Sequence, residues 1–159
     1  MNRRFRTAWY LLIAGIVLPQ CTIEDCVSIN TEEIILIFAD TADQTEEILS
    51  PTWDSIYGIG AISGLYGADT SAQNWFLPLN PARDTAEFVF VAYSSTDTTH
   101  DTLGLTYTTV EKVLGLECGY EISFENLELL YHTFDSARVV DSILTRENEV
   151  NLYLYQFSE

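Results

Sequence analysis

Short apolar runs, separated by polar turns, are the feature that most constrains the fold of this chain. Glu33–Ala39 is β-branched and apolar on both faces, which predicts a central strand buried on both sides. Phe88–Tyr93 alternates two apolar faces, and Tyr120–Glu125 alternates apolar with polar or acidic residues. About eight or nine short strands at this spacing predict an all-β fold, an antiparallel β-sandwich.

Some runs also indicate a position within the sandwich. Asn74–Leu79 is expected to be an edge strand, because Pro78 has no N–H to donate to a neighbouring strand. The strands Phe88–Tyr93 and Leu103–Thr108 should form a hairpin with a long polar tip, Ser94–Asp101. One helical turn and two late strands complete the expected set: Val110–Leu114, Asp141–Thr145 and Val150–Tyr155.

The charge of the chain is strongly negative and excludes two classes of partner. Seven Lys and Arg residues stand against 24 Asp and Glu residues, and three of the seven lie within the first twenty positions. Residues 21–159 therefore hold four cations against 24 acids, a formal charge of −20. Such a surface repels nucleic-acid phosphates and anionic lipid headgroups. We expect no nucleic-acid binding, and attachment to a membrane requires a covalent anchor.

The first twenty residues have the composition of a secretory leader. Three arginines precede the uncharged apolar run Ala8–Leu18. This run is too short for a membrane span of about 20 residues, but it suits the apolar part of a signal peptide. We therefore divide the chain into a signal peptide (1–20), a tether and lead-in (21–30) and one β-sandwich domain (31–159).

The end of the leader, Leu18-Pro19-Gln20-Cys21, resembles the lipobox of bacterial lipoproteins. In that motif the cysteine becomes the lipidated first residue of the mature chain, and Leu18 stands at the usual position before it. Gln20 departs from the small residue that usually precedes the cysteine. We expect Cys21 to carry a lipid that anchors the protein in a membrane. The alternative is an ordinary secretory leader with Cys21 as an odd thiol.

The sequence contains three cysteines, Cys21, Cys26 and Cys118. With Cys21 lipidated, Cys26 and Cys118 remain as a pair in an oxidising compartment, where two thiols usually form a disulfide. Such a bridge would hold the start of the mature chain beside the strand that begins at Tyr120. A bridge in which Cys21 replaces Cys26 is the alternative. Neither histidine lies at a ligand spacing from a cysteine, so we expect no metal site.

Several short motifs, taken in their order and spacing, resemble one family. They are the leader, Leu77-Pro78-Leu79, Leu103-Gly104-Leu105-Thr106-Tyr107, Glu117-Cys118-Gly119-Tyr120 and Glu149–Tyr155. The chain resembles the small uncharacterised lipoproteins of Bacteroidota, a domain-of-unknown-function family in which a second cysteine follows the lipobox cysteine by five residues. The resemblance implies an all-β envelope lipoprotein. Glu24 and Asp25 also resemble the acidic signal for export to the cell surface in that phylum. The alternative is that these two acids only keep the tether solvated.

A cluster of aromatic residues is the candidate ligand-binding site. Trp53, Tyr57 and Trp75 lie close together in the sequence, with Tyr66 and Phe76 beside them. Exposed among polar neighbours, these rings would form a platform for a sugar or a peptide. The alternative is packing in the sandwich core, where aromatic side chains usually lie.

Two other kinds of site have little support in the sequence. Asp40–Glu47 and the pair Asp97 and Asp101 offer oxygen ligands, but neither stretch has the regular spacing of a calcium loop. Ser63 stands one position late for a Gly-x-Ser-x-Gly elbow, and a histidine next to an aspartate, as at His100, does not establish a triad. We therefore expect no enzymatic activity, no metal and no cofactor.

These features predict an envelope lipoprotein that is anchored in the outer membrane and faces the periplasm or the cell surface. Its sandwich is expected to be a non-catalytic binding or accessory domain for an envelope protein or a glycan. A carbohydrate-binding or calcium-binding surface module is the alternative, and a hydrolase has less support.

Overall fold

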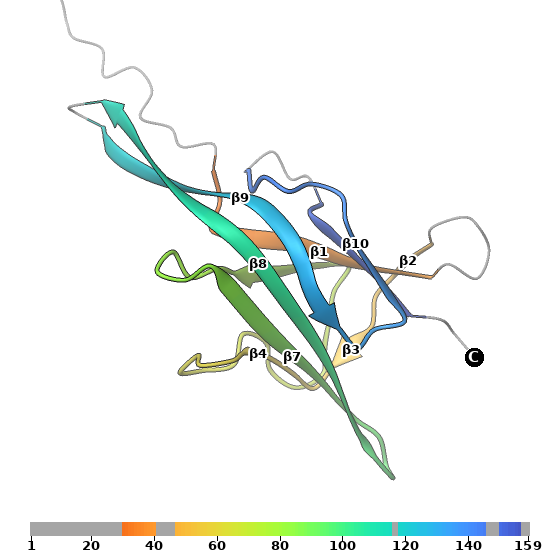
Figure 1. Cartoon of the computed structure of the whole chain (residues 1–159). Coiled ribbons are helices and arrows are strands. Elements are labelled where there is room, and N and C mark those ends of the chain that lie inside the picture. The colour runs from red at the N-terminus through yellow and green to blue at the C-terminus, as the bar shows by residue number, and fades with distance from the viewer. Residues whose placement is uncertain (1–29, 41–46, 116–117, 146–149, 157–159) are drawn as a thin grey trace, which may run out of the picture.

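The structure is a computed structural model that describes residues 30–40, 47–115, 118–145 and 150–156. Within these ranges the chain forms eleven strands and no helix (Figure 1). The strands are β1 (Glu33–Asp40), β2 (Glu47–Leu49), β3 (Thr52–Trp53), β4 (Ser55–Gly58), β5 (Thr70–Ser71), β6 (Asn74–Pro78), β7 (Thr85–Tyr93), β8 (Thr98–Gly115), β9 (Gly119–His132), β10 (Ser136–Val139) and β11 (Leu152–Tyr155).

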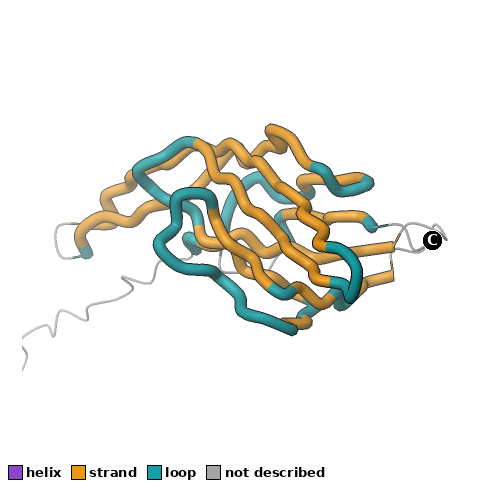
Figure 2. Tube along the Cα trace, turned by 90° about the horizontal axis from the view of Figure 1, so that it is seen from below, coloured by secondary structure: helices purple, strands orange, loops and turns teal. Residues whose placement is uncertain are grey.

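Two sheets form the two layers of a sandwich (Figures 1 and 2). The first sheet has the order β10-β11-β1-β2, with β6 also paired to β1, and the second has the order β4-β7-β8-β9. β3 and β5 pair separately. The predicted all-β sandwich is confirmed, with more strands than expected because β2, β3 and β5 are too short to leave a pattern in the sequence. One pairing departs from the predicted antiparallel arrangement, since β1 and β11 run parallel.

Strand β1 is the central strand of the first sheet. The side chains of Ile34–Ala39 are all buried. One edge of β1 pairs with β11, and the other edge pairs with β6 over Glu33–Ile37 and then with β2 over Phe38–Asp40. The structure thus confirms the predicted central strand and the predicted edge strand that contains Pro78, for which only the pairing with β1 occurs among the described residues.

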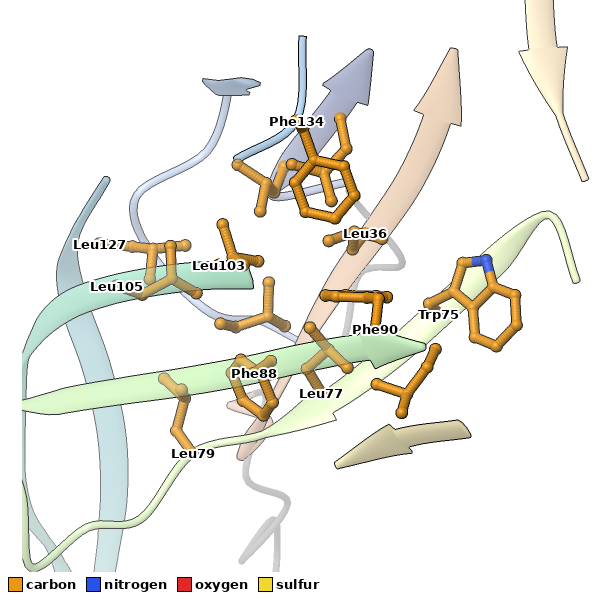
Figure 3. Packing of buried hydrophobic residues seen from close by; sticks show 14 of the residues in the cluster. Leu36, Trp75, Leu77, Leu79, Phe88, Phe90, Leu103, Leu105, Leu127 and Phe134 are labelled. Carbon is orange, nitrogen blue, oxygen red and sulfur yellow. The ribbon is translucent and has the colours of Figure 1, made fainter. Parts of the chain in front are cut away.

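The core lies between the two sheets and contains a cluster of aromatic rings. The ring of Phe38 lies 5.7 Å from that of Trp53, 6.0 Å from Phe90 and 5.8 Å from Phe134, measured between centroids. Such tilted or edge-to-face pairs each contribute about 0.5–1.5 kcal/mol beyond the burial of apolar area. Leucines from both sheets complete the core, among them Leu36, Leu77, Leu103 and Leu127 (Figure 3).

The hairpins of the second sheet are longer than predicted. β8 begins at Thr98, so the loop after β7 comprises only Ser94–Asp97 and not the predicted Ser94–Asp101. β8 then continues through Val110–Leu114, where the prediction of a helical turn is wrong. This segment is extended because Val110–Val113 pairs residue by residue with β9. β9 is continuous past Asn126, whose φ of 54° accommodates a register shift against β8.

The prediction of a strand at Asp141–Thr145 is also wrong, because this segment is a loop. The carboxylate of Asp141 accepts a hydrogen bond from the backbone N–H of Ile143 at 2.9 Å, which favours a turn over an extended strand. The strand lies earlier, at β10, and the Val150–Tyr155 prediction corresponds to β11.

Asn151 joins this loop to β1 through a buried amide. The side chain is 2% exposed, and its Oδ1 accepts a hydrogen bond from the backbone N–H of Ile35 at 2.9 Å. Its Nδ2 donates to the carbonyl oxygens of Asp141 and Ile143 at 3.5 and 3.4 Å. The backbone N–H of Asn151 donates to the carbonyl of Ile35 at 2.8 Å. One residue therefore satisfies backbone groups of two segments immediately before the parallel pairing of β11 with β1.

We predict that Asn151→Ala lowers the free energy of unfolding by about 3 kcal/mol, because a buried amide without a partner costs about 1–3 kcal/mol and the side chain satisfies three such groups. Chemical denaturation measures this value. Asn74→Ala, which truncates an exposed asparagine of β6 in the same sheet, is the control and should change it by less than about 0.5 kcal/mol. Equal effects of the two substitutions would contradict the role given to Asn151.

Candidate functional site

The structure does not place the two tryptophans of the aromatic cluster on the surface. Trp53 is 3% exposed and Trp75 is completely buried, and both belong to the core. The hydroxyl of Tyr66 donates to the carbonyl of Phe76 and accepts from its N–H, so it links two backbone segments. An open platform made of Trp53 and Trp75 is therefore ruled out, and the alternative interpretation as core packing holds for both.

Tyr57 differs from the tryptophans because it faces away from the core. It is half-buried on β4 and lies opposite Val89 of β7, whereas the preceding residue Ile56 is completely buried in the core. Successive side chains of a strand point to opposite faces. Tyr57 therefore lies on the outer face of the second sheet.

An open groove lies beside this outer face, where β4 ends. Its volume is about 320 Å³, and we call it the Glu87 groove. It is lined by the turn Gly58–Ala61 after β4, by Pro78, by the start of β7 and by the end of β9. This volume is at the lower end of the range for small-molecule sites. The sequence pattern did not identify this site.

The floor of the Glu87 groove includes a contact across three strands. By register Gly104 of β8 lies between Glu87 of β7 and Tyr131 of β9. A Cβ at Gly104 would lie 2.5 Å from the ring of Tyr131, so the ring covers this glycine closely. The Tyr131 hydroxyl donates a hydrogen bond to the Glu87 carboxylate. The absence of a side chain at Gly104 thus allows Tyr131 to reach across β8.

The Glu87 carboxylate also changes the pKa of Tyr131. Its hydrogen bond is the main cause that raises the pKa of Tyr131 above its ordinary value, because the neutral phenol is the donor. Tyr131 remains 43% exposed. The pair therefore presents an oriented phenol and a carboxylate to solvent.

A turn fixes the opposite rim of the groove. The N–H of Arg83 donates to the carbonyl of Asn80 at 3.0 Å, and the Asn80 side chain accepts from the N–H of Ala82 at 2.9 Å. The Tyr107 hydroxyl donates to the same Asn80 carbonyl at 2.9 Å. Burial raises the pKa of Tyr107, which keeps this donor protonated. Arg83, one of three Lys and Arg residues that the structure describes, is exposed at the rim, so the groove is lined by one cation and one acid, Glu87.

The residues considered for hydrolysis do not form a catalytic arrangement. His100 and Asp101 are consecutive residues of strand β8, so their side chains point to opposite faces. The Asp101 carboxylate instead accepts a hydrogen bond from the Thr133 hydroxyl at 2.8 Å. Ser63 is exposed in the loop between β4 and β5. Sequence adjacency at His100 therefore reflects a strand and not a base with its orienting acid.

The described residues contain no group of three or more His, Cys, Asp or Glu side chains that could hold a metal ion. Residues 41–46 of the acidic stretch considered for calcium lie outside the described ranges. Asp97 accepts a hydrogen bond from the N–H of Thr98 at 2.8 Å, and this contact belongs to the tight turn between β7 and β8.

Of the three cysteines, the structure describes only Cys118, which is disulfide-bonded. Cys21 and Cys26 lie outside the described residues, as does the predicted leader, so the lipid on Cys21 and the pairing of Cys26 with Cys118 stay predictions. Where the chain is described, no helix has the length and apolarity needed to cross a membrane.

The fold and the groove together define an all-β sandwich with an open polar site. The chain belongs to DUF6452, a family of unknown function, whose sequence model matches residues 55–156. This segment runs from the start of β4 to the end of β11, so it contains every residue of the Glu87 groove. No match was found among curated proteins or among solved structures.

We predict that Gly104→Ala and Tyr131→Ala are energetically coupled by about 1 kcal/mol, because the new methyl group displaces the Tyr131 ring. Gly104→Ala alone should lower the free energy of unfolding. In the Tyr131→Ala background it should be neutral or stabilising, since alanine restricts the unfolded chain more than glycine does. A double-mutant cycle by chemical denaturation measures the coupling, and strictly additive effects would argue against the packing of Tyr131 on Gly104.

Proposed function

We propose that the chain is an envelope lipoprotein of Bacteroidota, anchored in the outer membrane through a lipid on Cys21. Its sandwich is a non-catalytic binding or accessory domain that faces the periplasm or the cell surface. The leader and the motif that ends at Cys21 support the anchor. The observation that carries the binding role is the Glu87 groove, in which Glu87, Tyr131 and Arg83 present hydrogen-bonding groups.

The groove favours a neutral glycan as its ligand. A carboxylate, a phenol and a guanidinium provide acceptors and donors for hydroxyl groups, while Leu130 and Pro78 add apolar surface for the carbon face of a sugar ring. The strongly negative charge of the chain disfavours polyanionic ligands. An envelope protein that presents a polar segment is the other partner compatible with this surface.

The same proposal assigns the partner of Cys118 to Cys26. In the sequence Cys26 follows Cys21 by five positions, so a Cys26–Cys118 bridge leaves Cys21 available for its lipid. The bridge also joins the tether to the start of β9, which begins at Gly119.

Binding of neutral polysaccharides tests the ligand class. In affinity electrophoresis against glucan, mannan and galactan, we expect at least one polymer to retard the wild-type protein. Glu87→Ala and Tyr131→Ala should each weaken that retardation about tenfold, as expected when a buried or oriented hydrogen-bonding partner is lost.

Tyr93→Ala is the matched control, because Tyr93 is 64% exposed at the end of β7 and lies away from the groove. It should leave retardation unchanged. The glycan proposal would be overturned if no polymer retards the wild type, or if all three variants behave alike.

Metabolic labelling tests the anchor separately. We predict that a fatty-acid analogue labels the wild-type chain and Cys26→Ser, but not Cys21→Ser, because only Cys21 stands at the lipobox position. Label is read from the purified protein after delipidation. Equal label in wild type and Cys21→Ser would show that the lipid, if any, is attached elsewhere.

A further inference from the structure

The end of the β8–β9 hairpin exposes an apolar pair. Val113 of β8 lies opposite Tyr120 of β9, and the two side chains are 76% and 68% exposed. Leu114 beside them is half-buried. The hairpin projects beyond the sandwich in both views (Figures 1 and 2). Core packing therefore does not account for this pair.

The hairpin end lies beside the point at which the described chain begins. A second groove is lined by Asn30–Glu33 on one side and by Tyr120 and Ile122 on the other. Figure 1 shows the start of β1 and the end of the hairpin on the same side of the molecule, while the C-terminal end lies on the other side. An anchor on the N-terminal tether would therefore hold this end of the fold closest to the membrane.

Chain length limits how far this end can lie from the membrane. In the proposed function Cys21 carries the lipid and Cys26 is bonded to Cys118, and the inference rests on both assignments. Five residues span at most about 18 Å, and a disulfide adds up to about 7 Å between Cα atoms. Cys118, two positions before Tyr120, is therefore held within roughly 25 Å of the lipidated residue.

We propose that the apolar pair Val113–Tyr120 lies in the headgroup layer of the bilayer to which the lipid is attached. A tyrosine with an apolar ring and a polar hydroxyl suits this layer. On the opposite face of the hairpin Lys112 pairs by register with Glu121, while the exposed Glu111 lies on the same face as Val113. The described end of the hairpin therefore has a net charge of −1 from these three residues. Two side chains provide little apolar area, and their contact depends on the high effective concentration that the lipid anchor creates.

The proposal specifies a bilayer of neutral headgroups. The chain after the leader has a formal charge of −20, which anionic lipids would repel. A zwitterionic surface permits the contact, and addition of anionic lipid should weaken it.

Depth-dependent quenching of tryptophan by brominated lipid tests the contact. The full lipidated protein is reconstituted into phosphatidylcholine vesicles as Tyr120→Trp and, for comparison, as Tyr93→Trp. Tyr93 is a matched site, since it is 64% exposed but lies at the opposite hairpin end of the second sheet (Figure 1). Trp53 and Trp75 are buried in both variants and contribute the same background. Thermal unfolding checks that both variants fold.

We expect brominated lipid to quench Tyr120→Trp at least about twofold more strongly than Tyr93→Trp, because an interfacial ring contacts lipid whereas a distal one does not.

Vesicle flotation separates the anchor from the contact. Protein that floats without preferential quenching at position 120 overturns the contact and leaves the anchor intact. Protein that does not float overturns the anchor, and the contact with it. The tryptophan emission at position 120 could instead change with the amount of protein per vesicle and not with brominated lipid. That result would show that the apolar pair contacts a second copy of the chain, and it would overturn the proposal.

Discussion

The fold depends on the parallel pairing of β1 with β11, which the buried amide of Asn151 completes. This side chain bonds to the backbone of Ile35, 116 positions away in the sequence. β1 supplies the centre of one sheet and contributes Phe38 to the aromatic core, so its final position is fixed only when the last strand is in place. A sandwich closed in this way cannot form its first sheet from local contacts alone. The hydrogen bonds of Asn151 therefore stabilise the pairing on which the first sheet depends.

The second sheet is built differently, and this difference creates the candidate site. Its strands β7, β8 and β9 follow one another as long hairpins, so their register is local and continuous. That register brings Glu87, Gly104 and Tyr131 into one row across three strands. Because β4 ends at Gly58, it leaves the first residues of β7 uncovered, and the groove occupies this space. The site thus arises from a short strand next to a long one and not from an inserted loop.

The sequence predicts the parts of this structure that depend on local pattern. The run of β1, which is apolar on both faces, predicts a central strand, and the proline of β6 predicts an edge strand. Both predictions are confirmed. For Val110–Leu114 the sequence predicts the wrong structure, because a projecting hairpin has no buried face and hence no alternation of apolar and polar residues. The sequence does not decide whether Trp53 and Trp75 are buried, since the register of a strand determines which face of the sheet a side chain lies on. Glu87 and Tyr131 were missed for the same reason, although an isolated glycine inside a strand, as at Gly104, does indicate close approach of another group.

The two proposed surfaces constrain each other through Pro78. This residue lines both the Glu87 groove and the groove beside Tyr120, so the two are adjacent on the molecule. With the hairpin end at the bilayer, a ligand in the Glu87 groove would be bound near the membrane and not at the far end of the domain. A short tether joined to β9 by a disulfide would favour such a position, because it removes the freedom of the domain to turn away. A glycan or protein segment that lies close to the outer membrane is therefore the partner most consistent with both surfaces.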